Sequence, residues 1–426
     1  MSAPLSSPEP RAFLLDLLQA ALRAADPVLQ IARHLPPPPR GRTVVVGAGK
    51  ASAAMAAGLE AHWRGPLEGV VIVPYGYGAP TERVKVVEAA HPIPDAAGQK
   101  AAQSLMRLVE GLGPDDLVLA LISGGGSALM SLPAPTLSLE DKRSVTRALL
   151  MCGAPIAEIN CVRKHLSAVK GGRLAAAAFP ARVHALLVSD VAGDDPSVIA
   201  SGPTVPDPTT AADAAEILRR YKLDIPFAVS QFLKKPEAET PKPGDPRLAQ
   251  AGLDIIIRPA DVLATAAEHA RRQGVTPVLL GDRIEGESRE VARAFAGMAL
   301  SARAHGQPAA APCVLLSSGE TTVTVSGQGK GGPNGEFVLS AALALEGAQD
   351  IAVLACDTDG IDGALGAAGA LATADLLARA RAQGLDPRNF LANNDSAGFF
   401  GPLDALIKTG PTRTNVNDFR ALYIPK

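Results

Sequence analysis

The segment Val44–Trp63, VVVGAGKASAAMAAGLEAHW, decides the fold class of this chain. It opens with β-branched residues, turns at Gly47 and Gly49, and continues as an alanine-rich stretch. This order predicts a buried strand, a tight turn and a helix. Such a turn gathers free backbone N–H groups at the positive end of a helix dipole, where α/β proteins bind phosphate groups. Lys50 adds a cation directly after the second glycine.

The alternation of apolar runs and helical stretches continues on both sides of this segment. Further strands are expected within GVVIVPYG, VKVVEAAH, DLVLALIS and RVHALLVSD. Helices are expected over Phe13–Ala32, Ala51–Trp63, Gly98–Leu112, Leu139–Cys152 and Ile159–Ala178. Strands that are apolar on both faces and alternate with helices are typical of a parallel sheet covered on both sides. The predicted fold class is therefore α/β.

The length of 426 residues allows two or three domains. The best candidate boundary is 231–252, QFLKKPEAETPKPGDPRLAQAG, which is rich in proline and charge. The α/β pattern then resumes with LDIIIRPA, VTPVLLGD, CVLLSSGETTVTVSG and DIAVLACDTDG, and the third of these runs suggests a mixed sheet. We expect a Rossmann-like N-terminal domain over 1–235, a C-terminal α/β domain over 250–426, and the active site in the cleft between them.

Composition bounds the setting of the protein. A formal charge of −2 gives no reason to expect nucleic acid or an anionic membrane as a partner. The four cysteines lack CxxC spacing, so neither a zinc site nor a disulfide framework is predicted. No apolar run approaches the roughly 20 residues of a spanning helix, and the N-terminus lacks the basic start of a signal peptide. A cytoplasmic location is expected.

The first glycine-rich turn admits more than one interpretation. Gly47-x-Gly49 matches half of the dinucleotide fingerprint, but the third glycine and the ribose-binding acid at the end of the next strand are missing. It is not a Walker A motif, because GxxxxGK[ST] occurs nowhere in the chain. A tight connection without function is about as plausible for this turn alone.

A second turn, Ser123–Ser127 with the sequence SGGGS, gives a stronger signal. Three consecutive glycines cost chain entropy that a simple connection does not require. They allow backbone amides to converge on an anion, with two hydroxyl groups beside them. No GxSxG elbow is present, so a serine nucleophile is disfavoured. Two such turns at strand ends favour a phosphorylated ligand.

A basic segment, INCVRKHLSAVKGGRLA, follows the second turn. Asn160 is expected to cap a helix on which Arg163, Ser167 and Lys170 share one face. A solvated basic surface is the commoner fate of such runs. The glycine pair that follows Lys170 favours a binding contact, so we expect Arg163 and Lys170 to bind substrate.

Acidic residues gather beside glycine-rich loops in both halves of the chain. In the first half Asp190, Asp194 and Asp195 precede the loop Ser201-Gly202-Pro203-Thr204, and the second half carries Glu320, Asp357, Asp359 and Asp362. Carboxylates beside phosphate-binding loops suit Mg²⁺, which takes one or two carboxylates together with phosphate oxygens. Some of these acids are expected to be helix caps instead.

Taken together, these segments resemble the class II glycerate kinases, which join a Rossmann-like domain to a MOFRL domain. The resemblance runs from about Phe13 to Tyr423 and rests on GAGKASAAMA, HPIPDAAG, ISGGGSAL, VRKHLSAVKGGRLA, SDVAGDDPSVIASGPTVPDPTT, SSGETTVTVSGQGKGGPNGEF, DTDGIDG and GPTRTNVNDFRALYI. It implies ATP-dependent phosphorylation of D-glycerate to 2-phosphoglycerate with Mg²⁺. A homodimer is the expected assembly.

The resemblance assigns roles to residues of this chain. The essential lysine of the family falls on Lys50, and the acids of its TDGIDG loop fall on Asp359 and Asp362. The full set of expected site residues is Lys50, Asp190, Glu320 and Asp359 for catalysis; Asp190 and Asp195 for Mg²⁺; Gly49, Ser123, Gly124, Gly125, Gly126, Ser127, Ser201, Gly202 and Thr204 for ATP; and Arg163, Lys170, Lys330, Asn334, Arg413 and Asn417 for D-glycerate.

The chain departs from the family at Pro333. Many members read GGRNQE where this chain has GGPNGE, so the role of that arginine must pass to Lys330 or Arg413, or be absent. Two other functions are weighed against the kinase. Relatives of this sequence are often called hydroxypyruvate reductases, but a reductase needs the ribose-binding acid that is missing here. A metabolite sensor fits the fold but not the concentration of Lys, Asp and Gly at strand ends.

Overall fold

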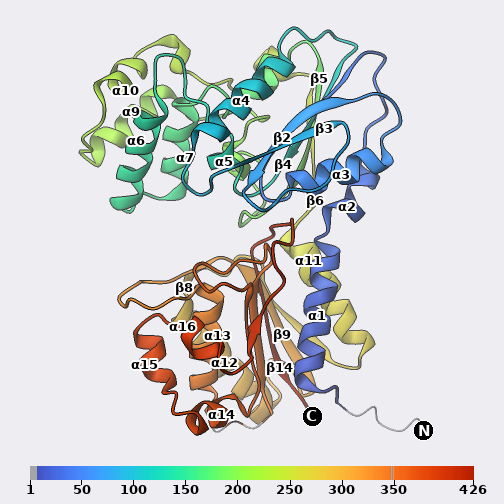
Figure 1. Cartoon of the computed structure of the whole chain (residues 1–426), viewed down its shortest axis with the longest axis vertical. Coiled ribbons are helices and arrows are strands. Elements are labelled where there is room, and N and C mark those ends of the chain that lie inside the picture. Colours follow the sequence, from blue (N-terminus) through green and yellow to red (C-terminus); the bar gives the residue numbers. More distant parts are fainter. Residues whose placement is uncertain (1–6, 347, 349) are drawn as a thin grey trace. The chain divides into compact units, whose positions relative to one another are not determined.

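The computed structural model describes residues 7–346, 348 and 350–426, and its chain divides into two compact units. One is Pro27–Ile256, and the other combines the described residues of Met1–Asp26 with those of Ile257–Lys426 (Figure 1). These limits differ from the predicted 1–235 and 250–426, because the leading helix belongs to the second unit and a strand beyond residue 250 belongs to the first. Among the described residues, no helix is long and apolar enough to cross a membrane.

The Pro27–Ile256 unit is built on a six-stranded sheet with the order β3-β2-β1-β4-β5-β6. Its strands are β1 (Thr43–Ala48), β2 (Glu68–Pro74), β3 (Val84–Ala89), β4 (Leu117–Ile122), β5 (Arg182–Val188) and β6 (Ala251–Ile257). The pairs from β3 to β5 are all parallel. This is the Rossmann strand order, which reverses between β1 and β4. The predicted Rossmann-like parallel sheet is therefore confirmed.

Helices and short 3-10 turns surround this sheet. They are α2 (Pro27–Gln30), α3 (Ser52–His62), α4 (Ala96–Val109), α5 (Gly126–Leu129), α6 (Leu139–Met151), α7 (Ile156–His165), α8 (Arg173–Ala178), α9 (Ala211–Arg220), α10 (Phe227–Phe232), η1 (Ile31–His34), η2 (Ile199–Ser201), η3 (Pro236–Ala238) and η4 (Pro246–Leu248). Alternate residues of β1, such as Val44 and Val46, form one core with α4 and α8.

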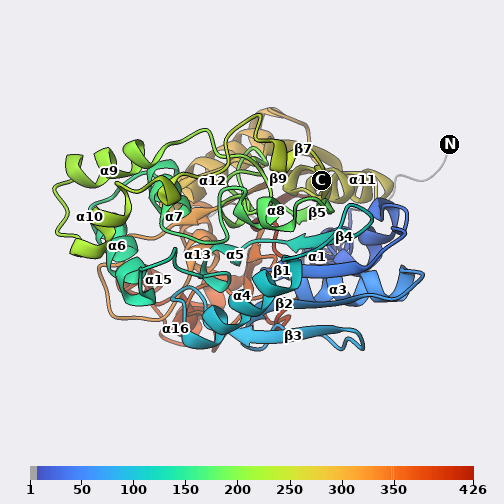
Figure 2. The same cartoon turned by 90° about the horizontal axis from the view of Figure 1, so that it is seen from above.

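A helical lobe lies beside the sheet within this unit. Figures 1 and 2 both show α6, α7, α9 and α10 gathered together, away from the strands that α3 and α4 cover. The lobe has its own apolar core, which includes Val145, Leu149, Ile159 and Phe232. α6 and α7 belong to this lobe, whereas α5 lies at the sheet. Side chains of the lobe and of the α5 region line one cavity, which is described below.

The proline-rich segment 231–252 is not the boundary that its composition predicts. It contains η3 and η4 and belongs to the Pro27–Ile256 unit, in which its residues Ala238 and Thr240 are buried. Thr240 donates a hydrogen bond to the buried carboxylate of Asp207. The strand after this segment, β6, lies next to β5 because Leu253 and Ile255 pack against the apolar core of the first sheet. The chain passes to the second unit only after Ile256.

The second unit contains a six-stranded sheet with the order β13-β12-β11-β14-β9-β7. Its strands are β7 (Thr276–Gly281), β9 (Cys313–Gly319), β11 (Ala352–Asp357), β12 (Gly369–Ala372), β13 (Leu406–Ile407) and β14 (Asp418–Ile424), and β8 (Gly286–Glu287) pairs separately with β10 (Thr321–Thr322). β7 and β9 are parallel, whereas β14 runs antiparallel to β9 and β11. The predicted mixed sheet is confirmed.

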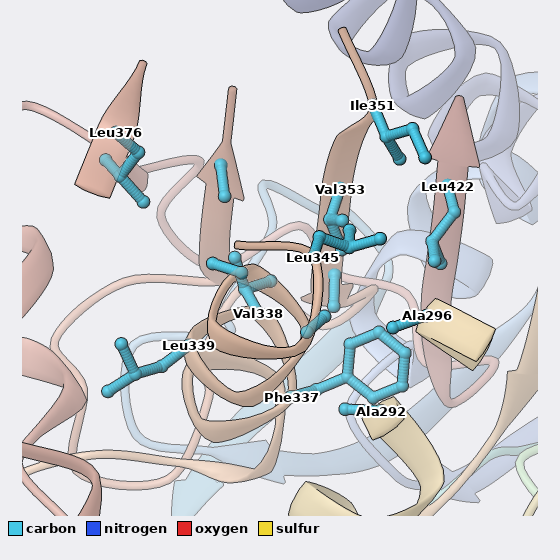
Figure 3. Packing of buried hydrophobic residues seen from close by; sticks show 14 of the residues in the cluster. Ala292, Ala296, Phe337, Val338, Leu339, Leu345, Ile351, Val353, Leu376 and Leu422 are labelled. Atoms are coloured by element: carbon cyan, nitrogen blue, oxygen red, sulfur yellow. The ribbon is translucent and has the colours of Figure 1, made fainter. Parts of the chain in front are cut away.

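Helices cover both faces of the second sheet (Figure 1): α1 and α11 lie on one face, and α12 and α13 on the other. The helices of this unit are α1 (Pro10–Ala24), α11 (Pro259–Arg272), α12 (Ser288–His305), α13 (Pro333–Ala344), α14 (Leu376–Ala382), α15 (Pro387–Ala392) and α16 (Ser396–Phe400). Figure 3 shows Phe337 and Val338 of α13 facing Val353 and Leu422 of the sheet. α1 buries Phe13 against Tyr423, with 4.4 Å between ring centroids, which fixes the leading helix to this unit.

Candidate active site

The two predicted glycine-rich turns meet at the point where the strand order reverses. The backbone N–H of Lys50 donates to the Gly124 carbonyl at 2.8 Å, and that of Ser123 donates to the Ala48 carbonyl at 3.1 Å. The Ser123 hydroxyl accepts from the Ala51 N–H at 2.9 Å and is fully buried. Ser123 therefore joins the two turns, and its hydroxyl is already engaged within the protein. Open α/β sheets bind their ligands at such a reversal point.

The glycines of these turns are required by close approach. A Cβ on Gly49, where φ is +141°, would lie 2.1 Å from the Ser123 hydroxyl oxygen. At Gly125, where φ is +82°, a Cβ would lie 3.1 Å from His91 Nε2 and 3.6 Å from Lys50 Cγ. A side chain at either position would therefore push against functional groups. Gly125 is thus the meeting point of the Lys50 and His91 side chains.

The third predicted phosphate loop joins the same site. Ser201 and Ser127 share a hydrogen bond between their hydroxyls at 2.7 Å, and Ser201 donates to Asn160 Oδ1 at 3.1 Å. Ala200 and Ser201 have φ values of 50° and 60°, which are strained for residues with a side chain. The backbone N–H groups of Gly171 and Gly172 donate hydrogen bonds to the Ser201 and Gly202 carbonyls and hold this conformation. Thr204 is buried near the same loop.

A cavity of about 420 Å³ opens beside these loops, within the range of ligand pockets. We call it the cationic cavity; its lining is His91, Pro92, Ile93, Pro94, Gly125, Ser127, Ala128, Ser131, Lys142, Arg143, Thr146, Arg147, Leu150, Arg163 and Lys170. These residues come from the 91–94 loop, the α5 region, α6, α7 and the loop before α8. Arg143 also donates to the Pro94 carbonyl, which ties α6 to the 91–94 loop.

Lys142, Arg163 and Lys170 are three of the five lysine and arginine side chains that line this cavity. Lys142 is 6% exposed and Lys170 is 1% exposed. Burial, together with the nearby Arg163, lowers the pKa of Lys142 to about 7. Burial and repulsion by Lys142 and Arg163 hold the pKa of Lys170 well below its ordinary value, and burial lowers the pKa of Arg163.

Backbone carbonyls, rather than carboxylates, accept the hydrogen bonds given for Lys142 and Lys170. Lys170 Nζ donates to the Met130 carbonyl at 2.8 Å, and Lys142 Nζ donates to the Leu132 carbonyl at 3.5 Å. Within the described part of the chain, no ion pair joins Lys142, Arg163 or Lys170 to a carboxylate. Buried charges are normally paired, so this arrangement is suited to an anionic ligand.

The two residues predicted to hold Mg²⁺ lie on the loop after β5. Asp190 is half-buried, whereas Asp195 is exposed and its Oδ1 accepts from the Ser197 N–H at 2.8 Å. No group of three acidic, His or Cys side chains able to hold a metal occurs among residues 7–346, 348 and 350–426. Two carboxylates still fit a Mg²⁺ ion that takes its other ligands from phosphate oxygens and water. The assignment of Asp190 and Asp195 to Mg²⁺ therefore stays a prediction.

The second unit gathers several predicted residues at one edge of its sheet. Asp418, the first residue of β14, pairs with Gly319 and Asp357, the last residues of β9 and β11. Glu320, Asp359 and Asn417 adjoin these residues and so lie at the same edge. Glu320 is exposed, Asp359 is buried with its Oδ1 accepting from the Ile361 N–H at 2.7 Å, and Asn417 is buried with φ at +62°.

Asn334 makes hydrogen bonds within the second unit, and its predicted contact with substrate stays a prediction. Its backbone N–H and its Nδ2 donate to Asp362 at 3.0 and 3.3 Å, and its Nδ2 also donates to Asp418 at 2.6 Å. Gly335 N–H donates to the other Asp362 oxygen at 2.8 Å. Asp362 thus caps the start of α13. Burial, with repulsion from Asp418, raises the pKa of Asp362 to about 7.

Comparison with known proteins gives the family. The family model described as a domain of unknown function, DUF4147, matches residues 13–234, and the MOFRL family model matches residues 313–418. A D-glycerate 2-kinase of Thermotoga maritima is 38% identical over 406 residues, which cover 95% of this chain and 96% of that protein. The chain belongs to the class II glycerate kinase family. An Agrobacterium vitis relative, named "Putative hydroxypyruvate reductase", is 52% identical over 97% of this chain and 94% of its own.

Solved structures of the family have the same fold. The glycerate kinase of Thermotoga maritima matches with a TM-score of 0.87 at 37% identity, covering 97% of this chain and 99% of that one. A protein of Pyrococcus horikoshii matches with a TM-score of 0.82 at 35% identity, covering 98% of each chain.

At Pro333, where many class II glycerate kinases have an arginine, this family member begins a helix. Pro333 is the first residue of α13, a position where proline is favoured because its missing N–H is not needed. The two candidates for the role of that arginine, Lys330 and Arg413, are both exposed. The backbone N–H of Lys330 donates to Asp395 Oδ1 at 3.1 Å, which fixes the loop before α13.

The basic segment of this family member folds differently from the single helix predicted over Ile159–Ala178. α7 ends at His165, and a turn containing Ser167 and Lys170 precedes α8. Asn160 lies inside α7 rather than at its N-cap. Gly171 and Gly172 have φ values of 59° and 82°, which end the helical path. Arg163 and Lys170 nevertheless line one cavity, as the binding hypothesis requires.

Sequence reasoning missed two contributors to the cationic cavity. One is His91, which is exposed and lines the cavity. Lys142 was not considered at all. A signal for it exists, because Lys142, Val145 and Leu149 form the buried stripe of α6, a pattern in which a lysine is out of place.

Proposed function

We propose that this chain transfers the γ-phosphoryl group of ATP to the 2-hydroxyl of D-glycerate. Membership of the glycerate kinase family supports the reaction, and the relatives named glycerate kinase extend over almost the whole chain. The single observation that carries the proposal is the convergence of three loops, through Lys50, Gly124 and Ser201, beside the cationic cavity. Phosphoryl transfer depends mainly on such positioning and charge stabilisation.

In the proposed step, the 2-hydroxyl oxygen of glycerate attacks the γ-phosphorus. A new O–P bond forms, the bond from the γ-phosphorus to the oxygen shared with the β-phosphate breaks, and ADP leaves with that oxygen. Lys50 stabilises the charge of the transferring group. The proton of the hydroxyl passes to a carboxylate, for which Glu320 and Asp359 remain the predicted candidates. That role requires the carboxylate to reach the substrate during turnover, which stays a prediction.

Mg²⁺ is proposed as the metal of this reaction, with Asp190 and Asp195 as the residues that would hold it. When bound, the ion neutralises charge on the phosphate oxygens. The half-buried position of Asp190 and the exposed position of Asp195 support a weak site completed by the nucleotide. A cytoplasmic location and a homodimer also stay predictions.

A hydroxypyruvate reductase is the second candidate, because a 52% identical relative bears that name and the strand order is that of dinucleotide-binding folds. β2 ends at Pro74 without the ribose-binding acid. Glu88 of β3 is near, but its Oε1 accepts from the Gly76 and Gly78 N–H groups at 3.2 Å each. The acid is therefore engaged in the turn after β2, which favours the kinase.

One pair of assays tests the proposal. The full-length protein is incubated with D-glycerate, ATP and Mg²⁺, and in parallel with hydroxypyruvate and NADH or NADPH. We expect glycerate-dependent formation of ADP and of 2-phosphoglycerate, which NMR distinguishes from the 3-isomer. Oxidation of the reduced nicotinamide without kinase turnover would replace the proposal with the reductase, and the absence of both activities would refute both.

A further inference from the structure

The cationic cavity calls for a ligand with several negative charges. Lys142 and Lys170 are almost fully buried, and together with Arg163 they repel one another. The single carboxylate of glycerate would offset one of these charges. A chain of phosphate groups would offset all three and would bring charge-assisted hydrogen bonds to each. The charge of the cavity therefore favours a polyphosphate over a simple carboxylic acid.

The size and polarity of the cavity point to the same class of ligand. A volume of about 420 Å³ is far larger than a three-carbon acid needs. Its polarity also changes from one end to the other. Ile93 is 62% exposed and Leu150 is 57% exposed, and these side chains form an apolar rim with Pro92 and Pro94. An apolar rim above buried cations suits a ligand with an aromatic ring at one end and phosphates at the other.

The neighbours of the cavity define the direction of such a ligand. Gly125 and Ser127 belong to its lining, and the Lys50 side chain approaches Gly125. The end of a phosphate chain at these residues would reach the turn that carries Lys50. The other end of the ligand would then lie toward solvent, where the exposed side chains Ile93 and Leu150 line the cavity.

We propose that the cationic cavity binds the nucleotide, with its phosphate chain on Lys142, Arg163 and Lys170 and its base at the rim of Ile93 and Leu150. This inference rests on the proposed kinase function. It assigns the nucleotide to the Pro27–Ile256 unit and moves Arg163 and Lys170 from glycerate to ATP. It also adds Lys142 as a specificity-determining residue.

Calorimetry on the full-length protein tests this assignment with three probes at matched ionic strength: the non-hydrolysable ATP analogue AMP-PNP, inorganic tripolyphosphate and D-glycerate. Lys142→Met should weaken the binding of both phosphate probes by at least tenfold, which is about 1.4 kcal/mol of binding free energy. The affinity for glycerate should stay within about twofold of wild type. Lys142→Arg should restore most of the loss. The matched control is Arg107→Met, which removes an exposed cation from α4 of the same unit.

A second variant tests the rim without altering a buried residue. Ile93→Asp places a negative charge on an exposed side chain, so folding is not in question. It should weaken AMP-PNP binding at least fivefold more than tripolyphosphate binding, because only the analogue carries a base. Equal effects on the two probes would overturn the placement of the base.

The outcomes separate this inference from the proposed function. Loss of glycerate affinity with unchanged phosphate affinity in Lys142→Met would assign the cavity to the acid and overturn the inference, while the kinase proposal stands. Unchanged binding of all three probes would overturn it as well. Wild-type protein that binds both phosphate probes at this cluster but forms no ADP with glycerate would refute the kinase and leave the cavity assignment intact.

Discussion

The hydroxyl oxygens of Ser127 and Ser201 lie 2.7 Å apart, although 74 positions separate the two residues in the chain. This contact joins the glycine-rich turn after β4 to the strained 3-10 turn η2. Ser201 continues the link to Asn160 of α7. Hydrogen bonds between polar side chains therefore connect the sheet and the helical lobe beside the cationic cavity.

Lys50→Ala tests the role of the first turn. Lys50 is half-buried and approaches Gly125 with its side chain. The variant should lower kcat/KM for glycerate phosphorylation by at least tenfold, about 1.4 kcal/mol of transition-state stabilisation, and leave Tm near the wild-type value. Lys85→Ala, on the exposed side of β3, is the control for lost charge. Activity equal to that of the control would remove Lys50 from the mechanism.

Gly125→Ala tests the close approach in the SGGGS turn. The added Cβ would lie 3.1 Å from His91 Nε2, at a residue whose φ of +82° already disfavours a side chain. We expect AMP-PNP affinity to fall at least tenfold in a folded protein. Gly297→Ala is the control, because Gly297 lies in α12 with no atom within 4 Å of the new Cβ. Equal nucleotide affinity in both variants would return the turn to a purely structural role.

Lys142→Met should stabilise the protein while it impairs function. Burial lowers the pKa of Lys142 from 10.5 to about 7, so between these values the unfolded chain binds more protons and stability rises with pH. The cost is complete below about pH 7. The free energy of unfolding of the variant should therefore exceed that of wild type most clearly at pH 6–7 and approach it near pH 10. Urea unfolding at several pH values measures this, and lower stability at pH 6.5 would contradict it.

Asp362→Ala should affect folding rather than substrate binding. Asp362 accepts from the N–H groups of Asn334 and Gly335 and from the Asn334 amide, so its removal leaves buried donors without a partner. The expected cost is about 2–3 kcal/mol, compared with about 0.5–1 kcal/mol for Asp386→Ala at the exposed cap of α15. Asp362→Asn should recover part of the loss. An unchanged Tm with lost activity would instead favour a catalytic role.

Removal of metal tests the proposed Mg²⁺ requirement. Excess EDTA should abolish glycerate-dependent formation of ADP, and added Mg²⁺ should restore it. Asp190→Asn should raise the Mg²⁺ concentration needed for half-maximal rate by at least fivefold, whereas Asp224→Asn, an exposed acid of the same unit, should not. Full turnover in EDTA would exclude the divalent ion from the reaction.

The sequence alone determined the order of strands and helices and the position of the glycine-rich turns. These features are local: the apolar period of a segment such as Thr43–Ala48 selects a buried strand, and Gly49 and Gly125 are needed where the backbone turns. The α/β class, the Rossmann-like sheet and the mixed second sheet follow from that pattern. The alternation of apolar strands with helical stretches along the chain was therefore sufficient to predict the fold class.

Only the tertiary structure decided which distant segments come together. The apolar side chains of β6 pack on the first sheet although the strand follows the proline-rich segment, and α1 packs on the second sheet although it begins the chain. Lys142 meets Arg163 and Lys170 in the same way, through the packing of α6 on α7. Contacts of this kind depend on complementary surfaces between segments far apart in sequence, and no local pattern of apolar or charged residues encodes which surface will be the partner.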